Sequence, residues 1–235
     1  MRTRLHNLVR SIFTDAQVHR LVPKRLDDVL EKVVYLIRLS RWQASNSDFD
    51  LGMKLNRVAL WSYLRVKENL EKAIDYLEFG VADGSSIKWW VNHNSDPYSR
   101  FFGFDTFTGL PKAWDSVPYG SFSTSGQLPD IKDSRCRFEV GVFSETLTAF
   151  LETFERKNRM VIHLDADLYG SMLYVLTMMF RLLARDDLII MGDFCSLRHP
   201  THVFRAFHDF VDAYPLHYHG IATIKGGQQL VIKVE

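Results

Sequence analysis

The chain has 235 residues, of which 46% are hydrophobic and 24% are charged, and its formal net charge is +1. This length fits one sizeable α/β domain with an appendage, and the ordinary composition predicts a globular protein with a proper core. A net charge near zero argues against a nucleic-acid partner. The two cysteines, Cys136 and Cys195, lie far apart, which excludes a disulfide scaffold and a zinc–thiolate site and favours a cytoplasmic location.

Helical spacing dominates residues 1–72, which we expect to form an N-terminal helical cap. Lysines and arginines outnumber acids six to one in residues 1–25, where five apolar residues share one helical face: Leu5, Leu8, Val9, Ile12 and Phe13. Such a basic amphipathic helix packs on its own domain or on a second subunit more often than on a membrane. We therefore expect a homodimer surface and no membrane contact here. Further helices are expected around 26–37 and over 53–70, with a loop at 43–50 between them.

The stretch 74–86 has the pattern of a strand, a turn and a helix start. Its apolar front half predicts a buried strand at 74–79, and small residues follow at Gly80, Ala82 and Gly84. Ser85 and Ser86 are expected as N-caps of the next helix. Doubly wound α/β folds open a ligand crevice at such a turn, and we expect glycines there because a ligand approaches the backbone closely.

Strand and helix signals alternate from here to the end of the chain, which predicts a largely parallel sheet. Strands are expected at 101–104, 137–140, 160–164 and 188–191, and helices at 144–156, 171–184 and 201–214. Gly226 and Gly227, between the β-rich runs 218–224 and 229–234, predict a closing antiparallel hairpin. The long loop 106–133 suits a functional segment. Its aromatic residues either line a ligand pocket or anchor the loop: Phe107, Trp114, Tyr119 and Phe122.

Carboxylates follow four of the predicted strands, at Glu78, Asp105, Asp165 with Asp167, and Asp193. Parallel topology brings all of them to the carboxyl-terminal edge of the sheet, where ligands bind. Glu78 beside the glycine turn suits a cation, because a pyrophosphate needs N–H groups and a helix dipole without an acid beside them. Asp105 has the position from which such folds hydrogen-bond a ribose.

Three stretches resemble the macrocin O-methyltransferase family: Glu-Phe-Gly-Val at 78–81, Gly-Phe-Asp-Thr-Phe-Thr-Gly-Leu-Pro at 103–111, and His-Leu-Asp-Ala-Asp-Leu-Tyr at 163–169. These enzymes use S-adenosylmethionine to methylate sugar hydroxyls. The likeness, which runs from about residue 74 to the end, implies a Rossmann-like class I methyltransferase sheet, mostly parallel with a C-terminal antiparallel hairpin. It implies a methyltransferase domain over 73–235 and the cofactor S-adenosylmethionine, whose sulfonium and ammonium groups suit Glu78.

The resemblance also implies roles for single residues. Contacts with S-adenosylmethionine are expected from Glu78, Gly80, Val81, Gly84, Ser85, Ser86, Asp105, Val142 and Ser144. In the family, the first Asp of the Asp-x-Asp-x-Tyr stretch and an Asp pair after the fifth strand hold Mg²⁺. Asp165 and Asp193 match two of these ligands, whereas Gly192 stands in place of the third, so Asp167 is a substitute candidate. Asp165 is the expected catalytic residue, as general base, metal ligand or both.

The expected function is therefore O-methylation of a hydroxyl on a sugar or other small metabolite, with or without Mg²⁺. A NAD-dependent oxidoreductase fits Asp105 but neither Glu78 nor the closing hairpin. A methyltransferase-like binding or scaffold protein without catalysis is allowed by Gly192. Five C-terminal histidines offer another base, although a solvated position suits each better: His199, His202, His208, His217 and His219. His163 is expected to be a core histidine.

Overall fold

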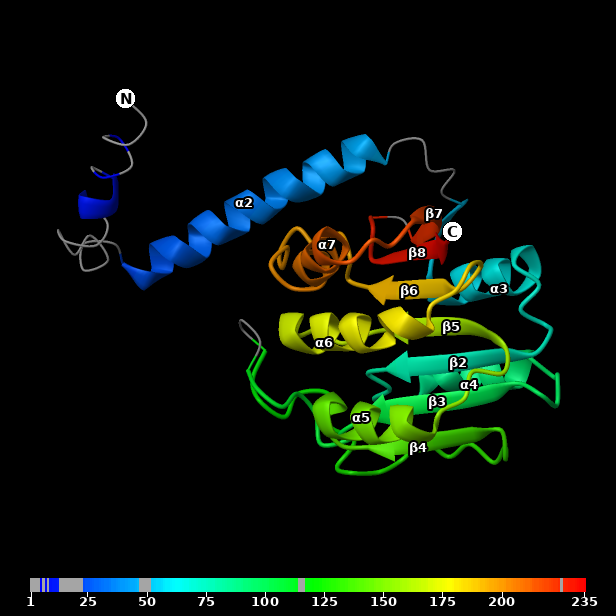
Figure 1. Cartoon of the computed structure of the whole chain (residues 1–235). Coiled ribbons are helices and arrows are strands. Elements are labelled where there is room, and N and C mark those ends of the chain that lie inside the picture. The colour runs from blue at the N-terminus through cyan, green and yellow to red at the C-terminus, as the bar shows by residue number, and fades with distance from the viewer. Residues whose placement is uncertain are drawn as a thin grey trace.

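A mixed eight-stranded sheet forms the centre of the protein (Figure 1). The structure is a computed structural model that describes residues 5, 7, 9–12, 23–46, 52–113, 117–224 and 226–235. The strand order is β1-β7-β8-β6-β5-β2-β3-β4. The strands are β1 (Gly52–Lys54), β2 (Ile74–Phe79), β3 (Arg100–Asp105), β4 (Cys136–Val140), β5 (Arg159–Leu164), β6 (Leu188–Gly192), β7 (Tyr218–Ile224) and β8 (Gln229–Val234). Only β8 runs antiparallel to its neighbours in this sheet of described residues, which confirms the predicted fold class.

Helices cover both faces of the sheet (Figure 1). They are α2 (Lys24–Ser45), α3 (Arg57–Lys67), α4 (Ser85–His93), α5 (Phe143–Thr153), α6 (Tyr169–Met179), the 3-10 turn η3 (Phe180–Leu182) and α7 (Val203–Ala213). One core cluster joins α5, α6 and α7 to the sheet, and a second joins α3 and α4 to its other face. All six residues of β2 are buried between these layers, including the two carboxylates Asp75 and Glu78.

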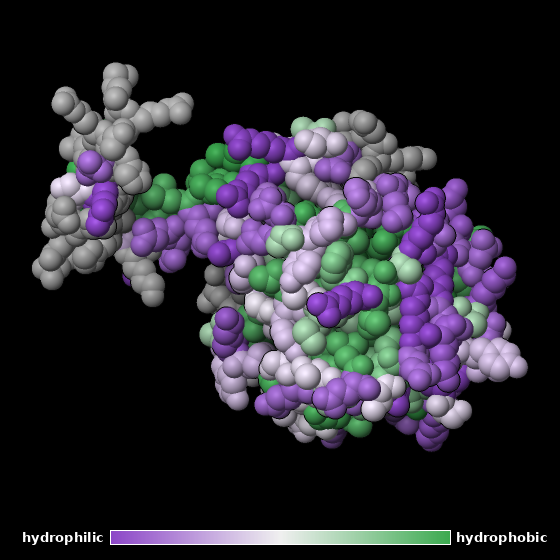
Figure 2. All heavy atoms as spheres, in the orientation of Figure 1, coloured by the Kyte–Doolittle hydropathy of each residue, from purple (hydrophilic) through white to green (hydrophobic). Residues whose placement is uncertain are grey.

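Helix α2 extends away from the sheet (Figure 1). Its C-terminal half is anchored, because Leu39 is buried and the Tyr35 hydroxyl donates to Asp209 of α7 at 3.3 Å. Apolar side chains remain on its surface (Figure 2), with exposures of 43–55%: Leu26, Val29, Leu30, Val33, Val34 and Ile37. Most of the predicted basic helix of residues 1–25, including Leu8 and Phe13, lies outside the described residues. The homodimer and the division at residue 72 stay predictions.

The prediction of one helix over 53–70 is wrong at its start. Residues 52–54 form β1, which pairs in parallel with β7, so that Met53 lies opposite Thr223. The sheet therefore begins inside the segment expected to be a helical cap. Helix α3 starts only after Asn56, whose side chain accepts a hydrogen bond from the Ala59 N–H at 2.9 Å. In the part of the chain that the structure describes, no helix is long and apolar enough to span a bilayer.

Candidate active site

A cavity of about 410 Å³ opens at the carboxyl-terminal edge of the sheet, where the loops after five strands meet helix α3. Nine of the predicted site residues line it: Gly80, Val81, Ser85, Ser86, Asp105, Val142, Asp165, Asp167 and Asp193. Its lining, as far as the described residues show, does not include Glu78, Gly84, Ser144 or any histidine. Sequence reasoning missed other lining residues, among them Arg57, Trp61, Asp83, Leu110, Ser121 and Phe143.

The glycine turn after β2 is shaped by the protein's own backbone. Gly80 has a φ of +92°, and a Cβ there would lie 2.4 Å from the carbonyl oxygen of Asp165. The need for glycine thus comes from the neighbouring chain after β5, which differs from the expected approach of a ligand. Gly84, with φ +77°, takes the N-cap position of α4. The expected N-cap roles of Ser85 and Ser86 are wrong, since the Ser85 hydroxyl donates to Asp83 and the Ser86 hydroxyl donates to Glu78.

Asp105 ties the glycine turn to the loop after β3. Its Oδ2 accepts hydrogen bonds from the backbone N–H groups of Val81 at 2.7 Å and Ala82 at 2.9 Å, and its Oδ1 accepts from the Phe107 N–H at 2.7 Å. Ala82 has a φ of +49°, a left-handed conformation that is uncommon for a residue other than glycine. A carboxylate held by three N–H groups keeps further lone pairs on the cavity side. The ribose contact expected of Asp105 stays a prediction.

Glu78 lies behind the cavity wall in a buried polar network. Its carboxylate accepts hydrogen bonds from the hydroxyls of Ser86 and Tyr76, the latter at 2.6 Å, and its side chain is fully buried. The Tyr76 oxygen lies 2.8 Å from Nδ1 of His163, and Gln229 donates to Nε2 of that ring at 3.3 Å. The His163 ring therefore lies between Tyr76 and Gln229 in this buried network. His163 is thus the core histidine that was expected, whereas Glu78 faces the cavity only through Ser86.

Three aspartates form an acidic cluster on one side of the cavity. Burial, together with the charges of Asp165 and Asp193, raises the pKa of Asp167 to about 7, and the charge of Arg57 opposes this shift. Burial and the Asp165 charge also raise the pKa of Asp193. The Arg57 guanidinium donates to Asp165 Oδ2 at 2.8 Å and to Oδ1 at 3.4 Å. The site therefore combines one paired and two poorly solvated carboxylates.

The cluster does not fit the magnesium site that the resemblance implies. A Cβ at Gly192 would lie 2.1 Å from Asp165 Oδ1, so this glycine supplies no ligand and Asp165 occupies the space of its side chain. Both Asp165 oxygens already face Arg57. Across the described ranges, no three His, Cys, Asp or Glu side chains are grouped so that they could hold a metal ion. Mg²⁺ completes its octahedron with water but needs one or two free carboxylates, and Asp165 is already engaged by Arg57.

The long loop after β3 divides its aromatic residues between the two expected roles. Phe107 is fully buried and meets Phe138 edge-on at 5.8 Å, so it anchors the loop. Phe122 lines the cavity with 59% of its surface exposed, close to Leu110 and Pro111 in the lining. Tyr119 is 74% exposed, and Trp114 lies outside the described residues. One of these aromatic residues therefore reaches the cavity, and one belongs to the core.

Arg57 and Trp61 come from α3, which the sequence reading did not connect with the site. They lie one helical turn apart and both line the cavity. No signal for this was available in the sequence, because the helix was expected to start at residue 53, whereas α3 begins at Arg57.

Comparison with solved structures defines the class. The calicheamicin methyltransferase CalS11 superimposes with a TM-score of 0.56 at 17% identity, over 90% of this chain and 94% of that chain. A second structure of CalS11, described as a TDP-rhamnose 3'-O-methyltransferase, gives 0.50 at 16% identity over 90% and 96%. An O-methyltransferase from Bacillus cereus in complex with SAH gives 0.51 at 13% identity over 95% and 96%. The chain thus has the fold of the class I O-methyltransferases.

Sequence comparison gives a family match over part of the chain. The family model for macrocin O-methyltransferase (TylF) matches residues 116–218. This match confirms the expected resemblance over the stretch that holds the acidic cluster, and it leaves the glycine turn and Asp105 outside. No curated protein sequence matches the chain with significant similarity.

Proposed function

We propose that the protein is an S-adenosylmethionine-dependent O-methyltransferase that acts on a hydroxyl of a sugar or other small metabolite. The charge of the cavity supports this best. Five aspartates line it against one cationic side chain, Arg57, among the described residues: Asp83, Asp105, Asp165, Asp167 and Asp193. An excess of carboxylates attracts a sulfonium and an ammonium and repels the pyrophosphate of NAD.

The cavity residues fit S-adenosylmethionine chemically. The glycine turn would hold its amino-acid part, Asp105 its ribose, and Val142 with Phe143 its adenine. Glu78 lies behind Ser86 and would add negative charge there, and the direct contact with the cofactor expected from the sequence stays a prediction. When bound, S-adenosylmethionine supplies an electrophilic methyl group on a positively charged sulfur.

The protein's own part is to orient the acceptor and to take its proton. Positioning of the acceptor oxygen in line with the methyl group provides most of the acceleration. The hydroxyl becomes strongly acidic as its oxygen gains the methyl group, so an ordinary carboxylate suffices as base. Asp165 is our candidate, because it lines the cavity and Arg57 holds it in place. The acceptor hydroxyl would then pass its proton to an Asp165 oxygen.

The acceptor class rests on three observations. CalS11 is described as acting on TDP-rhamnose, and the family model is that of a macrocin O-methyltransferase. The side of the cavity formed by Leu110, Pro111 and Phe122 offers apolar and aromatic surface of the kind that sugar rings pack against. Mg²⁺ is not part of this proposal.

Calorimetric titration tests the cofactor. We expect saturable binding of S-adenosylmethionine and of its demethylated product, and no binding of NAD at the same concentrations. Binding of NAD without S-adenosylmethionine would overturn the proposal in favour of an oxidoreductase. Incubation with labelled S-adenosylmethionine and a panel of nucleotide sugars then separates an enzyme from a scaffold protein, since only an enzyme yields a methylated sugar.

A further inference from the structure

The acidic cluster carries one observation that the proposed function leaves unexplained. Two features of the chain depart together from a metal-binding arrangement: residue 192 has no side chain, and Asp165 fills the space beside it. Arg57 of α3 donates two hydrogen bonds to the same Asp165 carboxylate, at 2.8 and 3.4 Å. The glycine and the arginine therefore act on the same carboxylate.

The position of Arg57 at the start of α3 is electrostatically unfavourable for that helix. Arg57 begins α3, and a cation in the first turn of a helix is disfavoured by the helix dipole. The other basic residues of α3, Arg65 and Lys67, lie in its last turn, where the dipole favours them. Pairing with Asp165 explains why Arg57 stands in the first turn. The Arg57 side chain is 48% exposed, yet it lines the cavity and its guanidinium contacts Asp165.

We propose that Arg57 takes the place of a divalent cation in this chain, and that Gly192 and Arg57 are a matched pair. The absence of a side chain at residue 192 lets Asp165 turn toward Arg57, and the guanidinium then supplies the positive charge that a metal would supply. Two of its five N–H groups serve Asp165, so others can reach an acceptor oxygen. The use of this pair in catalysis rests on the proposed function, whereas the pair itself does not.

Titration of the full chain with Mn²⁺ tests this proposal. Binding is measured by the loss of the electron paramagnetic resonance signal of free Mn²⁺. We expect no stoichiometric binding to the wild type, with or without the demethylated cofactor. The double variant Arg57→Ala with Gly192→Asp should bind one Mn²⁺ per chain, at least tenfold more tightly than either single variant. The reason is that Asp165 would be released while the missing carboxylate is restored.

Two matched controls separate charge from structure. Arg57→Lys with Gly192→Asp keeps a cation at the site and should not gain Mn²⁺ binding. Arg65→Ala with Gly192→Asp removes an arginine from the same helix that pairs with Glu71 at 2.7 Å outside the cavity, and it should not gain binding either. Thermal melting of each variant shows whether it folds.

Stoichiometric Mn²⁺ binding by the wild type would overturn the inference, and this measurement needs no variant. Equal Mn²⁺ affinity of the Arg57→Ala and Arg57→Lys double variants would also overturn it, because the charge would then be irrelevant. If the wild type binds no S-adenosylmethionine but the double variant gains Mn²⁺, the proposed function fails and the Arg57–Gly192 pairing stands.

Discussion

Single residues at the site make contacts that their positions in the sequence did not predict. Glu78 and Asp105 were both expected to face the ligand, because each ends a strand at the carboxyl-terminal edge. In the structure, Glu78 is buried behind Ser86, and the Asp105 carboxylate accepts hydrogen bonds from three backbone N–H groups. A strand-end pattern locates a carboxylate to within a few ångströms, but its hydrogen-bond partners come from loops whose course the pattern does not contain.

Asp105→Ala should weaken cofactor binding through the shape of the glycine turn. The change leaves the N–H groups of Val81, Ala82 and Phe107 without their acceptor, which costs about 1–3 kcal/mol of folding free energy. We expect at least a tenfold loss of S-adenosylmethionine affinity in calorimetry and a lower melting temperature.

Asp96→Ala is the matched control for this change, because Asp96 accepts from the Tyr98 N–H at 2.9 Å in an exposed turn away from the cavity. It should leave cofactor affinity unchanged. Wild-type affinity in Asp105→Ala would show that the three N–H bonds do not shape the binding turn.

Elements were predictable where burial left a periodic or continuous pattern. β2 follows its predicted bounds, since all six of its residues are apolar or held in buried contacts, and the antiparallel pair β7–β8 was indicated by Gly226 and Gly227. β1 was missed because three residues carry no period, and its identity depends on pairing with β7. The sequence also could not indicate that α3 forms a wall of the site. Helical spacing predicts which face of a helix is apolar, but it does not predict which loops the helix end contacts.

The N-cap of α3 should therefore affect both stability and the site. Asn56→Ala removes the hydrogen bond from the Ala59 N–H, which costs about 1 kcal/mol. For a chain of 235 residues this lowers the melting temperature by about 2–4 °C. Fraying of the first turn also loosens Arg57, so we expect weaker binding of S-adenosylmethionine in calorimetry. Asn56→Ser keeps a capping oxygen and should behave like the wild type; equal melting temperatures for the Ala and Ser variants would refute the role of the cap.

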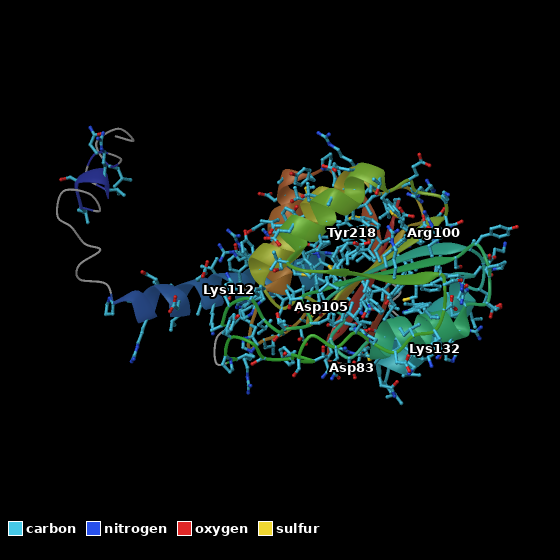
Figure 3. The ribbon with its side chains drawn as sticks, turned by 90° about the horizontal axis from the view of Figure 1, so that it is seen from below. Asp83, Arg100, Asp105, Lys112, Lys132 and Tyr218 are labelled. Atoms are coloured by element: carbon cyan, nitrogen blue, oxygen red, sulfur yellow. The ribbon has the colours of Figure 1, made fainter. Side chains whose placement is uncertain are left out.

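The whole molecule separates its charges between the two edges of the sheet. Figure 3 shows Arg100 and Asp105 well apart, at opposite ends of β3. At the amino-terminal edge, buried acids are paired: Asp75 with Arg100 at 2.7 Å and Asp187 with Arg156 at 2.7 Å. At the carboxyl-terminal edge, three aspartates share Arg57. Asp75 therefore stabilises the fold in its charged form, whereas burial raises the pKa of Asp187 despite its pairing with Arg156, as it raises those of Asp167 and Asp193.

The opposite pKa shifts of Asp75 and Asp167 predict opposite effects of pH on stability. Burial alone would raise the pKa of Asp75, but hydrogen bonds from Arg100 and from the backbone of Lys157 and Asn158 outweigh it, so the pKa is lowered. A lowered folded pKa contributes stability above the unfolded value of about 3.9, and this stability is lost as pH falls through the folded pKa. Asp167 has the reverse sign: with a folded pKa of about 7, its ionisation costs stability as pH rises from about 4 to 7.

Urea unfolding of two Asp→Asn variants between pH 3.5 and 8 measures both effects against the wild type. Asp75→Asn should lose about 3–5 kcal/mol at pH 7, because it leaves Arg100 without its buried partner, and the loss should shrink toward the acid end. Asp167→Asn should match the wild type near pH 4 and exceed its stability by about 1–3 kcal/mol at pH 8. The subtraction of wild-type values cancels the titration of groups common to both proteins. If Asp167→Asn gained nothing at pH 8, the carboxyl-terminal edge would not carry the unpaired charge on which the cationic cofactor is proposed to depend.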